Sequence, residues 1–273
     1  MRRDDPIGIF DSGVGGLTVA SEVMKRLPGE DIIYFGDTGR YPYGSRSPQI
    51  VRKFALEDVD FLSGSGIKAV VVACNTASSV ALDVLRGRFT IPIMGVIEPG
   101  ARAAVRATIN GILGVIGTRA TIKSGSYNQA IERIDPGLKV IAKPCPLFVA
   151  LAEEGWTEGE AVRLIAQEYL ATLKEVGVDV LVLGCTHYPL LSRVIGKVMG
   201  EDVTLIDSAK ETSRELRDLL EREGLLNPRK EGGSCRFLVT DDPEAFLEVG
   251  RNFLKEKVTG AELVAIERLK GEG

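Results

Sequence analysis

Two short apolar runs, each leading to a cysteine, constrain the fold of this chain more than any other feature. Residues 69–73 read AVVVA and precede Cys74, while residues 180–183 read VLVL and are followed, after a glycine, by Cys185. Such runs suit strands buried on both faces of a parallel sheet, and they are too short to cross a membrane. Open α/β sheets bind ligands beyond the carboxyl ends of their strands, so we expect both thiols at edges where chemistry takes place.

The other apolar segments repeat this plan of short strands separated by helical stretches. Cys185 follows Thr118 at nearly the same distance as Cys74 follows Asp11, which indicates an internal repeat in layout. Strands that alternate with helices favour βαβ units, so we predict an α/β fold with parallel sheets flanked by helices, in two similar domains with the active site between them. The expected strands are residues 7–10, 31–35, 69–73, 93–96, 112–116, 139–142, 180–183, 204–206, 237–239 and 263–266, and the clearest helices are 17–26, 48–62 and 209–223.

Composition narrows the function classes. The chain has 273 residues, of which 44% are hydrophobic and 26% charged, enough for the core of a globular protein. Its net charge of −4 provides no basic field for nucleic acid, and no apolar run approaches the ~20 residues of a membrane-spanning helix. The first ten residues contain no apolar signal segment, so we expect a cytoplasmic protein whose four cysteines form no disulfide framework.

The two matched thiols are the first candidates for chemistry. A free cysteine is often only a small buried hydrophobe, but packing alone does not require two of them at equivalent positions. We expect the pKa of a thiol at a helix N-terminus to be lowered, and Thr76 could cap the helix after Cys74. His187, the only histidine, follows Cys185 by two residues; it is either a structural hydrogen-bond partner or a group that moves protons.

Other polar residues allow both structural and functional interpretations. Asp11 begins the glycine-rich turn DSGVGG, where it could cap the following helix or lie beside Cys74, and the turn itself could hold a carboxylate. Glu153 and Glu154 could be a solvated helix end. Cys145 and Cys235 have no counterpart in the other half, so we interpret both as structural. A zinc site made by Cys74, Cys185 and His187 lacks the usual ligand spacing.

Several segments, taken in order, resemble the signature segments of the glutamate racemases, in the aspartate/glutamate racemase family. The resemblance extends over essentially the whole chain, and the paired CNT and CTH motifs are its most specific part. The matching segments are Asp11-Ser12-Gly13, Tyr43-Gly44, Ala73-Cys74-Asn75-Thr76, the stretch around Glu153, and Gly184-Cys185-Thr186-His187-Tyr188-Pro189.

The resemblance implies a reaction and a set of site residues. It implies that L-glutamate is racemised to D-glutamate for bacterial peptidoglycan synthesis, without cofactor or metal, by an enzyme that is frequently a homodimer. Cys74 and Cys185 would act on opposite faces of the substrate's α-carbon, with Asp11 assisting the first thiol and Glu153 and His187 the second. The implied substrate contacts are Asp11, Ser12, Tyr43, Gly44, Asn75, Thr76, Thr118, Thr121, Cys185 and Thr186.

The resemblance also implies two α/β domains related by pseudo-twofold symmetry, with the end of the chain returning to the first. The expected domains are residues 1–98 with 208–273, and residues 99–207.

Three other functions compete with this interpretation. A cysteine hydrolase would use a Cys185–His187 pair, although two residues so close on one tight turn make a hydrogen bond between them awkward. A non-catalytic sensor would bind the amino acid without changing its chirality. A related enzyme acting on aspartate would have the same motifs.

Overall fold

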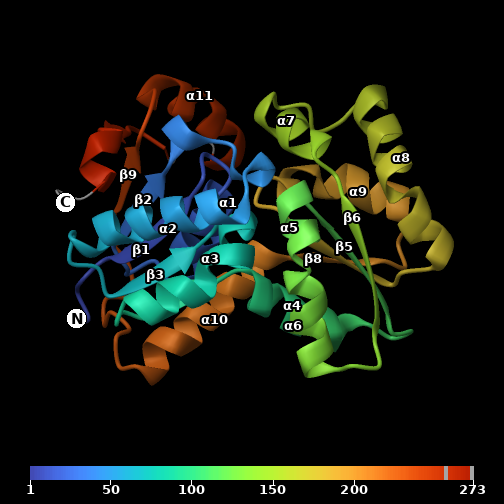
Figure 1. Ribbon diagram of the computed structural model, residues 1–273, viewed down its shortest axis with the longest axis horizontal. Helices are drawn as coiled ribbons and strands as arrows, with labels where there is room; N and C mark the ends of the chain where they lie inside the picture. Colours follow the sequence, from blue (N-terminus) through green and yellow to red (C-terminus); the bar gives the residue numbers. More distant parts are fainter. Residues whose placement is uncertain (255–257, 271–273) are drawn as a thin grey trace.

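The computed structural model describes residues 1–254 and 258–270, and it contains two parallel sheets that lie side by side (Figure 1). Residues 255–257 and 271–273 of the expected first domain lie outside this description. The first sheet has the spatial order β10 (Glu262–Leu263), β9 (Cys235–Val239), β2 (Ile32–Gly36), β1 (Ile7–Asp11), β3 (Ala69–Val72) and β4 (Ile93–Gly95). The second has the order β6 (Lys139–Pro144), β5 (Ile112–Gly117), β7 (Val180–Gly184) and β8 (Thr204–Asp207).

The two sheets share one topology, which confirms the predicted fold class. Strands β2, β1, β3 and β4 follow one another in space in the same order as β6, β5, β7 and β8, and every pairing is parallel. The first strand of each set therefore lies beside the third. This order brings the end of β1 next to that of β3, and the end of β5 next to that of β7.

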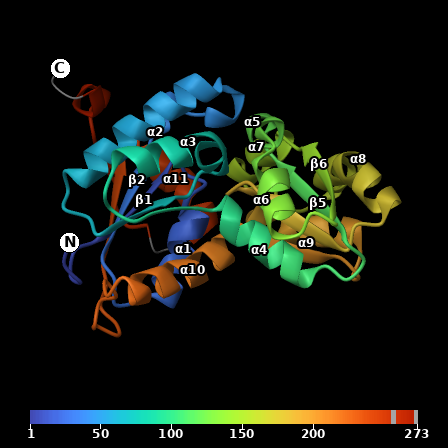
Figure 2. The ribbon, with the colours of Figure 1, turned by 60° about the horizontal axis from the view of Figure 1, so that its bottom comes forward.

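Helices cover both faces of each sheet (Figures 1 and 2), and we call each sheet with its helices a lobe. The helices of the first lobe are α1 (Leu17–Arg26), α2 (Pro48–Ser63), α3 (Asn75–Arg88), α10 (Ser208–Arg222) and α11 (Pro243–Leu254). Those of the second are α4 (Ile97–Ala107), α5 (Arg119–Ser124), α6 (Ser126–Ile134), α7 (Leu147–Glu153), α8 (Glu160–Val176) and α9 (Ser192–Met199). Short 3₁₀ turns are η1 (Thr38–Arg40), η2 (Tyr43–Ser45), η3 (Tyr188–Leu191) and η5 (Ile266–Lys270).

Strand β3 shows why its sequence is uniformly apolar. Val71 packs into the core on one face of the sheet, and Val70 and Val72 pack into the core on the other; all three are fully buried. A strand covered on both faces has no solvent side on which polar residues could alternate. The same holds for β7, where Leu181 and Val182 belong to different core clusters.

The end of the chain returns to the first sheet, but the strand expected at residues 263–266 is shorter and earlier. Strand β10 contains only Glu262–Leu263 and pairs only with β9, at the edge of the sheet. After one further hydrogen bond, from the N–H of Val264 to the carbonyl of Val239, the chain leaves the edge and turns into η5. A strand with a single neighbour gains little from extending further.

Helix α10 joins the two lobes. It packs on α1 in the first lobe and also against α4, which begins the second (Figure 2). The expected domain boundary after residue 98 falls in the first turn of α4, and the one before residue 208 falls at the start of α10.

Among the described residues, no helix is both long and apolar enough to cross a lipid bilayer.

Candidate active site

The shared topology places four polar residues at equivalent points of the two sheets. Asp11 is the last residue of β1, and Cys74 comes two residues after β3. In the second lobe Thr118 directly follows β5, and Cys185 directly follows β7. Because α3 of the first lobe packs against α5 of the second, these strand ends meet at the seam between the lobes.

The first half of the site is formed by Asp11, Ser12 and Cys74. The Cys74 side chain is 6% exposed, and its thiol donates to Ser12 Oγ at 3.5 Å. Asp11 is buried; its Oδ2 accepts from the Gly13 N–H at 2.9 Å, whereas its Oδ1 has no hydrogen-bond partner within the described residues. Burial raises the pKa of Asp11, and the nearby charge of His187 opposes part of that rise. Asp11 is therefore a buried carboxyl near Cys74 and not the cap of α1, whose cap position is Gly16.

The prediction that the pKa of Cys74 is lowered by a helix N-terminus is wrong. Cys74 does occupy the position before α3, but its pKa is raised to about 12, first by burial and then by the negative charge of Asp11. Removing the sulfur from water costs the thiolate more than the helix end returns to it. Cys74 therefore carries its proton at neutral pH.

The second half of the site is a chain of hydrogen bonds through Cys185, His187 and Glu153. The Nδ1 atom of His187 lies 3.8 Å from Cys185 Sγ, and its Nε2 lies 2.9 Å from Glu153 Oε1. Burial by itself would lower the pKa of His187, but the hydrogen bonds to Cys185 and Glu153 raise it to about 10. At neutral pH the ring is an imidazolium that offers one N–H to the sulfur and one to the carboxylate. Cys185 and His187 are thus within hydrogen-bond reach at a long distance, and the same Nδ1 atom also lies 3.4 Å from Thr186 Oγ1.

Glu153 and Glu154 differ in a way that the sequence did not reveal. Glu153 ends α7 and reaches His187, whereas Glu154 is exposed. The ring of Phe253, from α11 of the first lobe, packs edge-on against the His187 ring with 5.4 Å between centroids.

Three threonine hydroxyls cross the seam. Thr76 Oγ1 in α3 lies 2.9 Å from Thr118 Oγ1 and 3.3 Å from Thr121 Oγ1, and the last two oxygens are 2.9 Å apart. The prediction that Thr76 caps α3 is wrong, because that helix already begins at Asn75 and the Thr76 hydroxyl points to the other lobe. Thr118 is the residue that caps a helix, accepting from the N–H of Thr121.

Two more contacts across the seam involve residues that sequence reasoning missed. Asn75 Oδ1 accepts from the Tyr127 hydroxyl at 2.8 Å, and that hydroxyl lies 3.0 Å from Ser208 Oγ. A tyrosine in the first turn of a helix and a serine at a helix start carry no local signal for such a role. Their partnership follows only from the packing of α3, α6 and α10.

The glycine-rich turn also lets the two lobes approach each other closely. A Cβ atom added to Gly15 would lie 2.3 Å from Thr186 Oγ1 and 2.4 Å from the Cε1 atom of His187. The Thr18 hydroxyl reaches the carbonyl oxygen of Thr186 at 3.0 Å. The absence of a side chain at Gly15 thus lets the first lobe approach the turn that carries Cys185.

Tyr43 and Gly44 lie on the first-lobe side of the seam, but only one of them faces it. The Tyr43 side chain is fully buried, and its hydroxyl bonds to Asp37 and to Asp58, the latter at 2.9 Å. Arg40 pairs with the same two carboxylates. Gly44 approaches the second lobe so closely that a Cβ there would lie 3.0 Å from the Cβ of Thr118.

The remaining two cysteines are not among the expected site residues, and all four are free. Cys145 is buried in the core of the second lobe, and Cys235 begins β9 at the far end of the first sheet. In the part of the chain that the structure describes, no group of three His, Cys, Asp or Glu residues could hold a metal ion.

Comparison with known proteins identifies the family. The profile of the Asp/Glu/Hydantoin racemase family matches residues 18–216. A glutamate racemase of Geobacter metallireducens is 54% identical, over 97% of this chain and 98% of its own length. A solved glutamate racemase of Bacillus anthracis superposes with a TM-score of 0.93 at 42% identity, covering 97% of this chain and 99% of that one. A glutamate racemase of Francisella tularensis, solved with D-glutamate, superposes with a TM-score of 0.90 at 41% identity, covering 96% of this chain and 98% of that one. The chain therefore belongs to the Asp/Glu/Hydantoin racemase family, and it is an isomerase.

Proposed function

We propose that this enzyme interconverts L- and D-glutamate without a cofactor, using Cys74 and Cys185 as acid and base on opposite faces of the α-carbon. One observation carries the proposal: the two buried thiols follow equivalent strands of the two lobes, and a carboxyl serves each of them. Asp11 lies near Cys74, and Glu153 acts on Cys185 through His187. The D-glutamate bound by the relative from Francisella tularensis supports the substrate.

The electrostatics support opposite roles for the two thiols at the start of a turnover. Cys74 holds its proton and can donate it, whereas the imidazolium of His187 faces Cys185 and stabilises negative charge there. Cys185 removes the α-proton from one face, Cys74 then protonates the other face, and the roles exchange for the reverse direction. Asp11 lies near Cys74, and burial raises the pKa of its carboxyl, which suits it to exchange a proton with that thiol.

A carbanion forms between the two proton transfers, and without a cofactor there is no electron sink to delocalise its negative charge. Other groups must therefore stabilise it. Donors on both lobes are suited to its carboxylate: the hydroxyls of Ser12, Thr76 and Thr186, the amide of Asn75, and the Thr118–Thr121 pair. Tyr43 cannot use its hydroxyl, which is engaged by Asp37 and Asp58. We therefore assign to Tyr43 and Gly44 a contact through main-chain N–H groups at the start of η2, which have no acceptor within that turn.

The proposal extends to the organisation of the molecule. Residues 1–98 with 208–273 would form one domain and residues 99–207 the other, opening and closing about α4 and the start of α10. A homodimer, a cytoplasmic location and supply of D-glutamate for peptidoglycan belong to the proposal on the strength of the sequence.

A circular-dichroism time course tests the proposal directly. With L-glutamate, a chelator and no added cofactor, the signal should fall to zero as the racemic mixture forms, and D-glutamate should give the mirror-image decay. L-Aspartate in a parallel sample tests the related substrate. A stable signal with both glutamate enantiomers, or faster decay with aspartate, would refute the assignment.

A further inference from the structure

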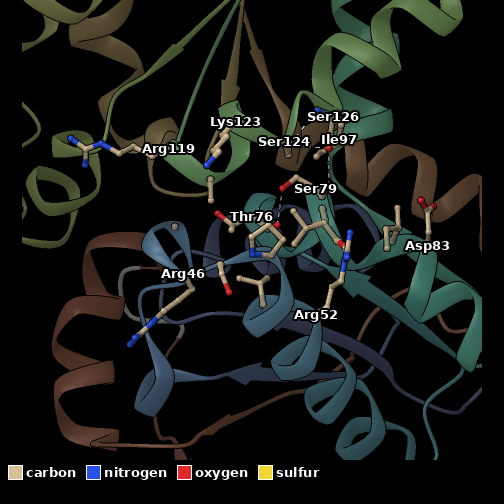
Figure 3. Close-up of a pocket in the computed structure, with 18 of the residues that line it drawn as sticks. Arg46, Arg52, Thr76, Ser79, Asp83, Ile97, Arg119, Lys123, Ser124 and Ser126 are labelled. Atoms are coloured by element: carbon tan, nitrogen blue, oxygen red, sulfur yellow. Dashed lines mark hydrogen bonds between the residues drawn. The ribbon is translucent and has the colours of Figure 1, made fainter.

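A cavity lies on the seam between the lobes, outside the thiol site. Its volume is about 880 Å³, within the range of small-molecule pockets. One wall comes from α2 and α3 of the first lobe and the other from α5 and α6 of the second (Figure 3). Two residues of its wall, Gly44 and Thr76, are also proposed substrate contacts.

The charge of this cavity is opposite to that of the whole chain. Five basic side chains line it, against the two acidic ones of Asp83 and Glu98, although the chain has a net charge of −4. Within the described residues, none of these five forms an ion pair. The basic side chains are Arg46, Arg52, Arg119, Lys123 and Arg133.

Two of these cations are placed to act on what lies in the cavity. Arg52 is anchored by a hydrogen bond from its Nε to the carbonyl of Val80, at 2.7 Å, which leaves the rest of its guanidinium unbound within the described residues. In Figure 3 the side chains of Lys123 and Thr76 face each other across the cavity. Exposed basic groups with no acidic partner raise the local concentration of anions.

The cavity and the thiol site share the seam, where Thr118 contacts two residues of the cavity wall, Thr76 and Gly44. The Thr76 and Thr118 hydroxyls meet at 2.9 Å, and Gly44 lies against Thr118. Cys74 and Cys185 are each 6% exposed, so a ligand reaches them only after some contact between the lobes opens. The contacts of Thr118 with Thr76 and Gly44 involve no charged group and no apolar core. Separating the lobes at these contacts should therefore cost little free energy.

We propose that this cavity is the cationic vestibule through which the dicarboxylate substrate reaches the thiols, passing between Thr118 and the pair formed by Gly44 and Thr76. The inference rests on the proposed function, because it assumes that the molecule passing through the cavity is glutamate, the substrate. Arg119 and Lys123 act on the substrate before it binds, so they govern its capture more than its conversion.

Kinetics of a charge-neutralised enzyme test this vestibule. In Arg119→Gln/Lys123→Gln we expect kcat/KM for glutamate to fall about tenfold at low salt, with a much smaller change in kcat. The deficit should shrink as salt rises and screens the cations. Lys139→Gln/Arg217→Gln is the matched control: both side chains are exposed, neither lines the cavity, and the change in net charge is the same. An equal loss in the control, or a salt-independent loss, would overturn the proposal.

Thiol alkylation provides a readout that does not depend on racemisation. Iodoacetate is an anion and iodoacetamide is neutral, and mass spectrometry locates the label on Cys74 or Cys185. The ratio of the two alkylation rates should fall several-fold in the vestibule variant and stay unchanged in the control. If the wild type fails to racemise glutamate but the vestibule variant shows this change in ratio, the proposed function fails and the vestibule stands. Two results would contradict the vestibule. One is an unchanged ratio of alkylation rates in the variant. The other is that inorganic phosphate slows alkylation of the thiols but does not compete with glutamate.

Discussion

The His187 Nε2 atom lies 2.9 Å from Glu153 Oε1, on the opposite side of the ring from the Nδ1 atom that faces Cys185. The bond joins the end of α7 to the turn after β7, across 34 residues of sequence. It holds the imidazole in one orientation and supplies the negative charge that keeps the ring protonated while buried. The carboxylate therefore acts on the sulfur through the ring between them.

Replacing this carboxylate should change the pH dependence of the reaction. Glu153→Gln keeps a hydrogen-bond acceptor but removes the charge, so the pKa of His187, now about 10, should fall. We expect kcat/KM to fall by about 10² and its alkaline limb to move to lower pH. A pH profile measures both, with Glu154→Gln as the control because that neighbour is exposed. A uniformly lower profile with an unmoved alkaline limb would show that Glu153 acts only on structure.

Replacing each thiol should separate the two half-reactions. Cys74→Ser and Cys185→Ser should each slow racemisation by about 10² or more, because a serine hydroxyl is a far weaker acid than a thiol. Each variant keeps one base, so in deuterium oxide each should exchange the α-proton of a single enantiomer, and the two variants should select opposite enantiomers. Proton NMR of both enantiomers measures this exchange, with Cys235→Ser as the control. Exchange of the same enantiomer by both variants would contradict a site with two faces.

The strands and the two thiols were predictable because their signals are local. An apolar run such as residues 69–73 announces a buried strand by composition alone, and matching positions in two halves single out Cys74 and Cys185. The topology then places both at the seam without further information. Strand β10 was misjudged because its length depends on a pairing partner, β9, that no local pattern reveals.

The electrostatics of the site were not predictable, because they depend on burial and on partners distant in sequence. A helix N-terminus favours a thiolate, but at Cys74 burial and the charge of Asp11 outweigh it. Tyr127 meets Asn75 across 52 residues, and Ser208 meets Tyr127 across 81. The Thr76 hydroxyl, expected to serve its own helix, instead serves the other lobe.

Gly15 should tolerate no side chain, because the turn of the second lobe occupies the space. In Gly15→Ala the new methyl group would overlap Thr186 and His187, so either the lobes separate or the imidazole turns away from Cys185. We expect kcat to fall at least tenfold, since misplacement by about 1 Å can cost about 10² in rate. Gly87→Ala is the matched control: Gly87 lies in α3 with nothing within 4 Å of the added atom, and the change should stabilise the fold by about 0.5–1 kcal/mol. Steady-state kinetics and thermal unfolding of both variants decide; a fully active Gly15→Ala enzyme would contradict the close approach.

The buried carboxyl of Asp11 should cost the enzyme stability. Burial raises its pKa and its Oδ1 has no partner within the described residues, so ionising it in the folded state is unfavourable. A carboxyl whose folded pKa exceeds its unfolded value of about 3.9 destabilises the fold progressively as pH rises from that value to the folded pKa. Asp11→Asn should therefore lose most activity, yet unfold at a Tm higher by roughly 2–4 °C at pH 7, which corresponds to about 1 kcal/mol. The difference should vanish below about pH 4, where both states protonate the aspartate.

Asp179→Asn provides the control of opposite sign for this measurement. Burial opposes ionisation there too, but hydrogen bonds from the Asn110 N–H, the Thr108 hydroxyl and the Ile109 N–H lower the pKa of Asp179 overall. Its carboxylate therefore stabilises the fold above the unfolded pKa, and that stability is lost as pH falls through the lower folded value. Asp179→Asn should thus lower Tm at pH 7, whereas Asp11→Asn raises it. Calorimetry at several pH values compares the two, and a lower Tm for both at neutral pH would show that Asp11 is a structural carboxylate like Asp179.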